Sequence, residues 1–407
     1  MENPKIRFKG FTKDWEQRKF SELVTIERGG SPRPIDKFIT NDENGLNWVK
    51  IGDAPEQGNY ITQTAEKIRP EGLSKTREVH PGDLILSNSM SFGRPYIMAI
   101  DGCIHDGWLA IRDTKKNFDL KFLCTLLGTD GMLNQYKAMA AGSTVNNLNK
   151  ELVGGTTVAF PMVEEQIKIG DYFTTLDHLI TLHQRKCEQT KKLKKYMLQK
   201  MFPRNGAKVP EIRFDGFTYD WEQRKLGEIY GSIGNAFVGT ATPYYAEHGH
   251  FYLESNNVKD GQINHNAEIF INDEFYEKQK DKWLHTGDMV MVQSGHVGHA
   301  AVIPEELDNT AAHALIMFRN PKEEIEPYFL NYEYQTDKAK KQIENITTGN
   351  TIKHILASDM QEFVVDIPKY EEQKVIASYF CKLDHLITLH QRQTDFYKKP
   401  NFYFISS

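Results

Sequence analysis

The strongest constraint on this chain is an internal duplication, which is the first thing to look for in a sequence of this length. The segment PKIRFKGFTKDWEQRK at 4–19 returns at 210–225 as PEIRFDGFTYDWEQRK. A second block begins with Glu-Glu-Gln at 164, contains LDHLITLHQR, and returns from 371 to 392. The offsets are 206 and 207 residues. Chance does not produce two such matches, so the 407-residue chain is a tandem repeat.

The sequences between the shared blocks diverge. Residues of about 24–160 and about 230–368 keep only a faint common frame, in which GDLIL at 82–86 resembles GDMVM at 287–291 and GSTV at 142–145 resembles GNTI at 349–352. Short alternating runs separated by Gly, Pro and Asn indicate mixed strands and helices without a βαβ series. We therefore expect two different α+β domains on near-identical connectors. The expected boundaries are a first domain at 1–160, a helical spacer at 161–203, a second domain at 204–368, and a distal helical spacer at 369–407.

The connectors have the pattern of long helices. Pro161 and Pro368 each precede an acidic pair, which suits the positive end of a helix dipole. Seam residues then follow with heptad-like spacing, which predicts that the two helices pack on each other as an antiparallel coiled coil with a pseudo-twofold arrangement. These residues are Ile169, Phe173, Leu176, Ile180, His183 and Cys187 in the first copy, and Ile376, Phe380, Leu383, Ile387, His390 and Thr394 in the second. The alternative is that each helix packs on its own domain. The two histidines are expected to be packed polar residues without a catalytic role.

The two helices are not expected to be equally long. The first could run from Glu164 to Gln199, about 54 Å, before the sequence at 201–206 breaks it. The second departs from its copy after Asp395, and Lys398-Lys399-Pro400 is expected to stop it. The distal spacer therefore looks shortened.

Composition limits the class of protein. A chain of this length is expected to form two to four domains, and no apolar run approaches the roughly 18 residues of a membrane span. The N-terminus lacks the apolar core of a signal peptide. Four cysteines without CxxC spacing (Cys103, Cys124, Cys187 and Cys381) suggest a reducing cytoplasm. The net charge is −5, but residues 185–208 carry nine Lys or Arg and one Glu, so any contact with nucleic acid must come from local patches.

Four features together resemble the specificity subunit of type I restriction-modification systems. They are the repeated RFxGFxxDWE segment, RGGSP at 28–32, GDLIL at 82–86 followed by the polar stretch SNS, and the PxxEEQ motif that opens each helix and leads to LDxLI. The resemblance covers essentially the whole chain, and the duplicated helix-opening motif is its most specific element.

The resemblance implies a non-catalytic subunit with two target-recognition domains. Each domain would read one half of a split, asymmetric sequence in double-stranded DNA, and the helices would form a coiled-coil spacer. Two methyltransferase subunits would dock mainly on the repeated helical parts, and motor-nuclease subunits would join that core. S-adenosylmethionine, ATP and magnesium would belong to these partners, with no cofactor on this chain. The physics of a split site favours a rigid spacer, because two readers must match a helical repeat of about 34–36 Å.

Base readout favours Arg, Lys, Asn, Gln, Ser and Thr on exposed loops, where a solvated turn is the ordinary alternative. In the first domain the candidate DNA contacts are Arg28, Ser31, Arg33, Ser87, Asn88, Ser89, Arg94, Ser143, Thr144 and Asn146. In the second they are Gln293, Ser294, His296, His299, Thr348, Asn350, Thr351, Lys353 and His354. The basic run Lys191, Lys192, Lys194 and Lys195 could neutralise phosphates, form a solvated helix face or meet an acidic partner.

Three other functions remain as alternatives. His296 and His299, with His313 nearby, suggest a metal site, but no carboxylate or cysteine accompanies them, so no metal is expected. A DNA-modifying enzyme would need an Asn- or Asp-Pro-Pro-aromatic loop or GxxxxGK[ST], and the chain has neither. Asp366 with Glu372 and Lys374 imitates a nuclease pattern that the first copy lacks. A purely structural coiled-coil adaptor would leave the two divergent domains without a role.

Overall fold

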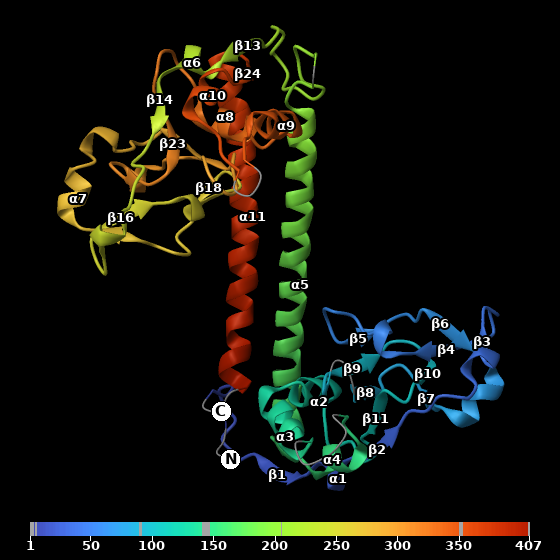
Figure 1. Cartoon of the computed structure of the whole chain (residues 1–407). Coiled ribbons are helices and arrows are strands. Elements are labelled where there is room, and N and C mark those ends of the chain that lie inside the picture. The colour runs from blue at the N-terminus through green and yellow to red at the C-terminus, as the bar shows by residue number, and fades with distance from the viewer. Residues whose placement is uncertain are drawn as a thin grey trace. The chain divides into compact units, whose positions relative to one another are not determined.

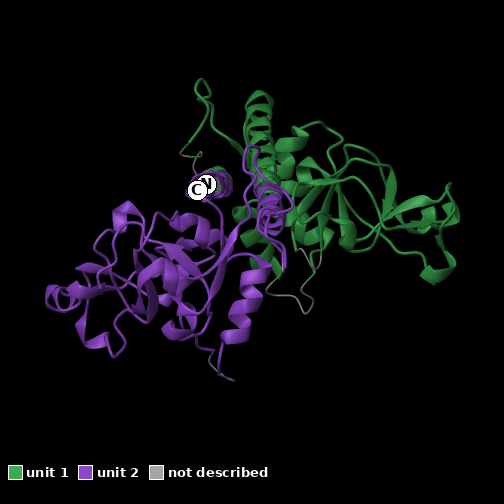
Figure 2. Cartoon of the chain, turned by 90° about the horizontal axis from the view of Figure 1, so that it is seen from above, with its two compact units in different colours: residues 1–186, 390–407 green, residues 187–389 purple. Residues whose placement is uncertain are grey.

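The computed structural model describes residues 4, 6–88, 92–140, 147–204, 206–349 and 353–405, with side chains as far as Lys398. The chain forms two compact units, residues 1–186 with 390–407 and residues 187–389, shown in two colours in Figure 2. Each unit therefore contains one globular domain and parts of both long helices.

The globular part of unit 1 contains two five-stranded sheets and short helices. One sheet has the order β2-β11-β8-β9-β5, formed by β2 (Thr25–Arg28), β5 (Tyr60–Ile61), β8 (Leu84–Ser87), β9 (Pro95–Met98) and β11 (Trp108–Arg112). The other has the order β3-β6-β4-β10-β7, formed by β3 (Ile39–Thr40), β4 (Leu46–Val49), β6 (Glu66–Ile68), β7 (Arg77–Val79) and β10 (Gly102–Ile104). The helices are α1 (Phe20–Leu23), α2 (Leu120–Leu127), α3 (Asp130–Ala140) and α4 (Lys150–Gly155), with 3-10 turns at Ile35–Lys37, Ile51–Asp53 and Pro70–Lys75.

Strand β8 shows why the GDLIL sequence is continuously apolar. Leu84 and Leu86 lie in the core cluster that contains α2 and α3, whereas Ile85 lies in a second cluster with β9, β10 and β11. Side chains alternate between the faces of a strand, so a strand with both faces covered must be apolar throughout.

Unit 2 repeats this plan with a different sequence. Its sheets have the orders β14-β23-β20-β21, β15-β19-β16-β22 and β17-β18. The strands are β14 (Tyr230–Asn235), β15 (Tyr245–Ala246), β16 (His250–Leu253), β17 (Val258–Lys259), β18 (Gln262–Ile263), β19 (Phe270–Ile271), β20 (Met289–Val292), β21 (Ala300–Val302), β22 (Ala311–Ala312) and β23 (Leu315–Pro321). The helices are α6 (Leu226–Ile229), α7 (Asp273–Glu277), α8 (Pro327–Glu333), α9 (Asp337–Ile346) and α10 (Ala357–Gln361), with 3-10 turns at Thr242–Tyr244, Ser255–Asn257, Lys280–Lys282 and Glu305–Leu307. Both units mix helices with largely antiparallel sheets, so the α+β expectation is confirmed.

A two-stranded ladder ties each shared N-terminal segment to the strand that precedes a long helix. β1 (Glu16–Lys19) pairs antiparallel with β12 (Thr157–Phe160), and β13 (Glu222–Lys225) pairs in the same way with β24 (Val364–Ile367). The two blocks that are repeated in sequence thus meet in space in each unit.

The long helices are α5 (Val163–Lys200) and α11 (Tyr370–Ile405), green and red in Figure 1. The bounds of α5 agree with the expected Glu164–Gln199. The prediction that Pro400 stops the second helix is wrong, because α11 continues to Ile405. A proline in a helix removes one backbone hydrogen bond and favours a kink, and neighbouring turns can still continue the helix.

The expected seam divides into two parts. Ile169, Phe173 and Leu176 are buried in the core cluster of unit 1 together with strands and helices of the globular domain. Ile376, Phe380 and Leu383 are buried in the same way in the core of unit 2. For these residues the alternative holds, in which each helix packs on its own domain. The other long helix also reaches each cluster, through Tyr397 of α11 in unit 1 and Leu198 of α5 in unit 2.

Direct contact between the helices involves the later seam residues. In unit 1, His183 faces His390, and Ile180 and both histidines are half-buried. In unit 2, Cys187 Sγ lies 3.9 Å from the Ile387 carbonyl oxygen, Lys194 binds Asp384, and Phe202 contacts Phe380. From one of these contacts to the next, the residue numbers rise in α5 and fall in α11, so the two helices pack antiparallel in unit 2.

Candidate functional site

The repeated motif at the start of each long helix has a structural role. Arg7 donates two hydrogen bonds to Glu165, from Nε at 2.9 Å and from Nη2 at 2.6 Å, and the Glu165 side chain is only 1% exposed. Arg213 binds Glu372 in the same bidentate way at 2.7 Å. The planar guanidinium fork matches a carboxylate, so the pair fixes the shared N-terminal segment to the helix start.

The glutamine of the motif completes this junction. The Gln166 side chain donates to the Pro161 carbonyl oxygen at 2.9 Å and accepts from the backbone N–H of Asp119, which precedes α2. Gln373 donates to Pro368 and accepts from Glu326 in unit 2. The PxxEEQ pattern therefore connects the long helix with the first helix that packs on it.

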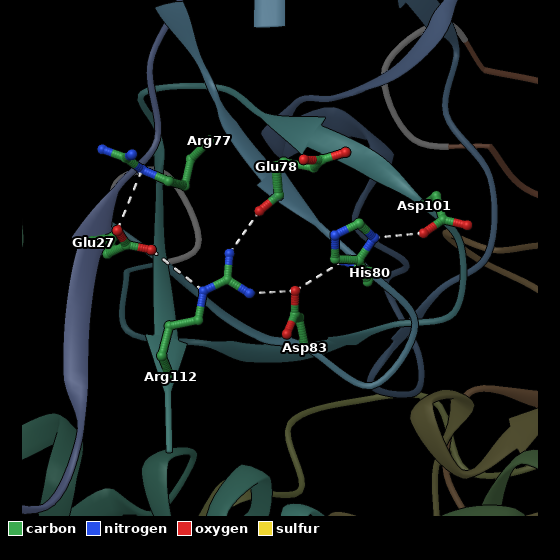
Figure 3. Close-up of polar contacts among 7 residues, drawn as sticks. All are labelled: Glu27, Arg77, Glu78, His80, Asp83, Asp101 and Arg112. Carbon is green, nitrogen blue, oxygen red and sulfur yellow. Dashed lines mark hydrogen bonds and ion pairs between the residues drawn. The ribbon is translucent and has the colours of Figure 1, made fainter. Parts of the chain in front are cut away.

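The Gly-Asp motif is also structural (Figure 3). Gly82 has a φ of 94°, and the Asp83 carboxylate accepts from the His80 backbone N–H at 2.8 Å and from Arg112 Nη1 at 2.5 Å. Arg112 also binds Glu27, and His80 Nδ1 lies 2.7 Å from Asp101. The bond to Asp101 raises the pKa of His80. Asp288 caps the equivalent turn at His285 in unit 2. The motif therefore shapes the turn before a buried strand, and its carboxylate is already engaged.

Several of the expected DNA contacts of unit 1 converge on Asp106, in the loop between β10 and β11. Ser31 Oγ donates to Asp106 Oδ1 at 3.0 Å, and Arg33 Nη2 lies 4.0 Å from Oδ2. The backbone oxygen of Asp106 accepts from Arg28 Nε at 3.3 Å and from Asn88 Nδ2 at 2.8 Å. The Arg33 side chain is 83% exposed, so most of it is accessible although its Nη2 lies near Asp106.

Glycines allow this convergence. A Cβ added to Gly29 would lie 2.2 Å from the His105 carbonyl oxygen, and one added to Gly30 would lie 2.4 Å from the Lys75 carbonyl oxygen. Both distances are far below van der Waals contact. The two glycines of RGGSP are therefore required by close backbone approach, which places Ser31 beside Asp106.

Not every candidate in unit 1 is exposed. Ser87 and Asn88 are 0% and 2% exposed, so the expectation that they lie on an exposed loop is wrong for both side chains. Asn88 holds the Asp106 backbone instead. Arg94 is half-buried, donates to the carbonyl oxygens of Glu56 and Gly58, and covers the Tyr96 ring. It lies in the connection between β8 and β9, which also contains Asn88.

The candidates of unit 2 form a cluster of their own. Ser294 and Thr348 each pair with His354 through isolated β-bridges, and the Lys353 carbonyl oxygen accepts from the Gly295 N–H. His296 Nε2 lies 2.9 Å from the Ser255 carbonyl oxygen, and its ring centroid is 5.5 Å from that of His299. The Gln293 carbonyl oxygen accepts from Ile355, which secures the same loop. The structure thus brings together loops that are about 50 residues apart in sequence.

Six candidates fall outside the described residues. They are Ser89, Ser143, Thr144, Asn146, Asn350 and Thr351.

Sequence reasoning missed the residues that organise the loops. Asp106 and His105 follow β10, and His105 Nε2 lies 2.8 Å from Asp106 Oδ1. At the equivalent place in unit 2, His313 Nε2 contacts the Gly239 carbonyl oxygen at 2.9 Å, and Nδ1 lies 3.3 Å from Glu254. The signal was a histidine that directly follows the last residue of a β-strand in both halves, and it is visible only after the strands are aligned.

The residues whose sequence pattern suggested a metal site or a nuclease have other partners in the structure. Among the described residues no group of three or more His, Cys, Asp or Glu could hold a metal ion. His299 Nδ1 accepts from the Asp260 N–H at 3.1 Å, which engages one of the two suspected ligands. In the nuclease-like pattern, Asp366 pairs with Lys338, Glu372 with Arg213 and Lys374 with Glu371. These carboxylates serve separate ion pairs rather than one site.

A family model covers most of the chain. The type I restriction modification DNA specificity domain matches residues 12–192 and again residues 219–395. The chain belongs to this family. The two matches correspond to the two copies found by the repeat, and the resemblance seen in the motifs is confirmed.

Individual specificity subunits are similar to this chain over nearly its full length. The type I restriction enzyme specificity subunits MjaX and MjaVIII of Methanocaldococcus jannaschii are 24% and 23% identical over 411 and 400 residues, and each match covers 94% of this chain and 89% of the relative. The EcoBI specificity subunit of Escherichia coli is 20% identical over 377 residues, which is 89% of this chain and 77% of that one.

Solved structures support the same fold. The S subunit of a type I restriction-modification system from M. genitalium superposes with a TM-score of 0.64 at 13% identity, covering 99% of this chain and 98% of that one. A chain from a study of complex assembly and conformational transition of a type I R-M system superposes with a TM-score of 0.52 at 17% identity, covering 97% of both. As in this family generally, the role indicated for the chain is non-catalytic. None of its described helices is long and apolar enough to cross a membrane.

Proposed function

We propose that this specificity subunit reads a bipartite, asymmetric sequence in double-stranded DNA, one half with each unit. The main support for this proposal is that the two units share one scaffold and differ in their loops. The junctions of Arg7 with Glu165 and of Arg213 with Glu372 are equivalent, whereas the loop clusters of the two units differ. In unit 1 the loops gather at Asp106, and in unit 2 at His354. A constant scaffold with divergent loops is what a reader of two unlike half-sites requires.

Within unit 1 the side chains divide into two roles. Arg28, Ser31 and Arg33 are the proposed DNA contacts, because arginine can read guanine bidentately and serine can bind either base edges or phosphates. Asp106 and Asn88 are positioning residues that hold the loop. In unit 2 the proposed contacts are Ser294, His296, His299, Thr348, Lys353 and His354, with Gln293 securing the loop. The basic residues Lys191, Lys192 and Lys195 are proposed to meet phosphates or an acidic partner, whereas Lys194 is engaged by Asp384.

The proposed partners are two methyltransferase subunits and the motor-nuclease subunits, which would carry S-adenosylmethionine, ATP and magnesium. Exposed apolar side chains support docking on the repeated helical parts. Met162, Val163 and Ile167 are 42–44% exposed at the start of α5, and Leu193, Tyr196, Leu386 and Leu389 are 38–54% exposed on the two helices in unit 2. The four free cysteines agree with a location in the reducing cytoplasm, which we include in the proposal.

The long helices are the proposed spacer. The 38 residues of α5 correspond to about 57 Å of helix, which is longer than one turn of DNA. Lengthening α5 and α11 together by matched heptads should lengthen the nonspecific gap and leave both half-sites unchanged.

The direct test exchanges the DNA-reading region of unit 1 for that of a relative. Residues 24–160 are replaced by the equivalent region of a relative, the chain is expressed with its cognate methyltransferase subunit, and methylated sites are mapped across the host genome. One half of the site should change and the other should remain. If both halves change, or neither does, the assignment of one half-site to each unit is wrong. The purified chain alone should not transfer methyl groups or cleave DNA, and measurable methyl transfer by it would favour the alternative of an enzyme.

A further inference from the structure

Two histidines of unit 2 lie side by side in the turn between β20 and β21. The ring centroids of His296 and His299 are 5.5 Å apart. The Val292 N–H donates to the His299 carbonyl oxygen at 2.8 Å, and the Gly298 N–H donates to the Val292 carbonyl oxygen at 3.1 Å. Gly298 has a φ of 84°, which favours glycine at this position. The pair is therefore held on a tight, hydrogen-bonded turn.

The His296 ring is fixed by a carbonyl group. Its Nε2 lies 2.9 Å from the Ser255 carbonyl oxygen. A carbonyl oxygen can only accept, so the ring donates from Nε2, and in a neutral imidazole the other ring nitrogen then carries no hydrogen. Among the residues that the structure describes, none forms a hydrogen bond with His296 Nδ1. His296 is exposed, so it offers a free acceptor to a ligand.

The His299 ring is fixed in the opposite sense. The backbone N–H of Asp260 donates to its Nδ1 at 3.1 Å. Because an N–H group can only donate, Nδ1 carries no hydrogen and the hydrogen of the neutral ring is on Nε2. In the described part of the chain this Nε2 has no acceptor, and 31% of the side chain is exposed. His299 therefore offers a free donor beside the free acceptor of His296.

The charges around the pair suit a nucleic acid. Burial lowers the pKa of His299, the Asp260 carboxylate raises it by less, and the positive charges of Lys259 and Lys340 lower it further. Both lysines are exposed, and neither forms a salt bridge with a residue in the described ranges. Two free ammonium groups beside the histidines can neutralise phosphates, and the lowered pKa keeps His299 neutral at pH 7.5.

The equivalent turn of unit 1 has a different arrangement. The Arg94 carbonyl oxygen accepts from the Ser87 N–H as that of His299 accepts from Val292, so Arg94 takes the place of His299. The Arg94 guanidinium donates to two carbonyl oxygens of the segment before β5. The pair of free acceptor and free donor therefore distinguishes unit 2 from unit 1, as expected for readers of unlike half-sites.

We propose that His296 and His299 together select an adenine in the major groove of the half-site that unit 2 reads. Adenine presents there an acceptor, N7, beside a donor, the N6 amino group, and no other single base presents both. His299 Nε2 donates to N7, and His296 Nδ1 accepts from N6. Guanine has two acceptors, so it leaves the acceptor of His296 without a donor. This assignment rests on the proposed reading of one half-site by unit 2 and adds the base that the pair selects.

The test uses the complex of this chain with its methyltransferase subunits and DNA in which one adenine at a time is altered. The half-site of unit 2 is the half that stays unchanged when residues 24–160 are exchanged. At each of its adenines, 7-deazaadenine removes the N7 acceptor and unsubstituted purine removes the N6 amino group. Binding is measured at pH 7.5 without a methyl donor. At one adenine each analogue should weaken specific binding about fivefold, the loss expected for one neutral hydrogen bond.

Histidine variants then assign each contact. In His299→Ala, 7-deazaadenine at that position should cause no further loss, whereas purine should still weaken binding, because each contact can be lost only once. His296→Ala should show the reverse. His285→Ala is the matched control, because His285 precedes β20 whereas the pair follows it, and it should keep both analogue effects. Thermal unfolding checks that each variant remains folded.

Two failures can be told apart. If both analogue effects persist in the two variants at every adenine, the assignment of adenine to the pair is wrong, while the reading of a half-site by unit 2 stands. If the exchange of residues 24–160 changes both halves of the site, the proposed reading fails and this assignment fails with it.

Discussion

His183 and His390 occupy equivalent positions in the two copies of the repeat, and their Nδ1 atoms face each other at 3.0 Å. Two ring nitrogens at this distance can share one hydrogen, with one ring donating and the other accepting, but two protonated rings would repel. The contact therefore disfavours a state in which both rings are protonated. Burial, followed by the charge that His183 would carry, lowers the pKa of His390.

This geometry predicts a pH dependence of stability. Because the pKa of His390 is lowered in the folded state, the unfolded chain takes up a proton first as the pH falls below about 6.5. The free energy of unfolding should therefore decrease from pH 7.5 to 5.5, and His390→Gln should reduce this decrease. His80→Gln supplies a contrast, because the bond to Asp101 raises the pKa of His80 and its stabilisation is complete at low pH and lost as the pH rises. Denaturant melts at several pH values measure both. Equal pH profiles for the His390→Gln variant and the original chain would contradict the prediction.

The junction of Arg7 with Glu165 should be essential for stability. Arg7→Ala leaves a buried carboxylate without its partner and is expected to lower the free energy of unfolding by about 3–5 kcal/mol. Arg18→Ala is the control, because Arg18 pairs with Glu22 on the surface, where both side chains are 40–51% exposed, and such a pair contributes at most about 1 kcal/mol. Chemical denaturation gives both values. Similar losses for the two variants would show that the junction is not a buried ion pair in solution.

Gly29 is predicted to be intolerant of a side chain. In Gly29→Ala the new Cβ would lie 2.2 Å from the His105 carbonyl oxygen, so the backbone must move and the RGGSP loop should lose its position. Gly52→Ala is a matched control, because nothing lies within 4 Å of its added Cβ. We expect Gly29→Ala to lower the melting temperature and weaken DNA binding by the assembled complex, while Gly52→Ala leaves both nearly unchanged. Normal DNA binding by a complex that contains Gly29→Ala would contradict this prediction.

Asp106 is predicted to act through the residues that it holds. Asp106→Ala releases Ser31 and Arg33 and should weaken specific DNA binding by the complex about tenfold. Methylation mapping should show relaxed recognition in the half-site of unit 1 alone, since Asp106 belongs to unit 1. Lys115→Ala is the control, because Lys115 lies beyond the opposite end of β11 from the Asp106 loop. Relaxation of both half-sites, or of neither, would show that Asp106 does not position the reader.

The sequence by itself determined the architecture at the level of the repeat. Two blocks copied over 206–207 residues required two equivalent scaffolds, and their PxxEEQ and RFxGF patterns marked the places where Glu165 and Arg7 meet. The heptad-like spacing of the seam residues located both long helices. These features are local, so the order of residues along the chain is sufficient to indicate them.

Only the tertiary structure decided which residues meet across the loops and between the helices. Asp106 gathers Arg28, Ser31, Arg33 and Asn88 from segments far apart in sequence, and no periodicity announces such a meeting. A heptad pattern shows which helix face is apolar but not what covers it, which is why Phe173 and Phe380 pack on their own domains while His183 faces His390. Likewise, Asp177 and Asp384 are identical in sequence context, and only the packing of the end of α5 shows that Asp384 is paired with Lys194.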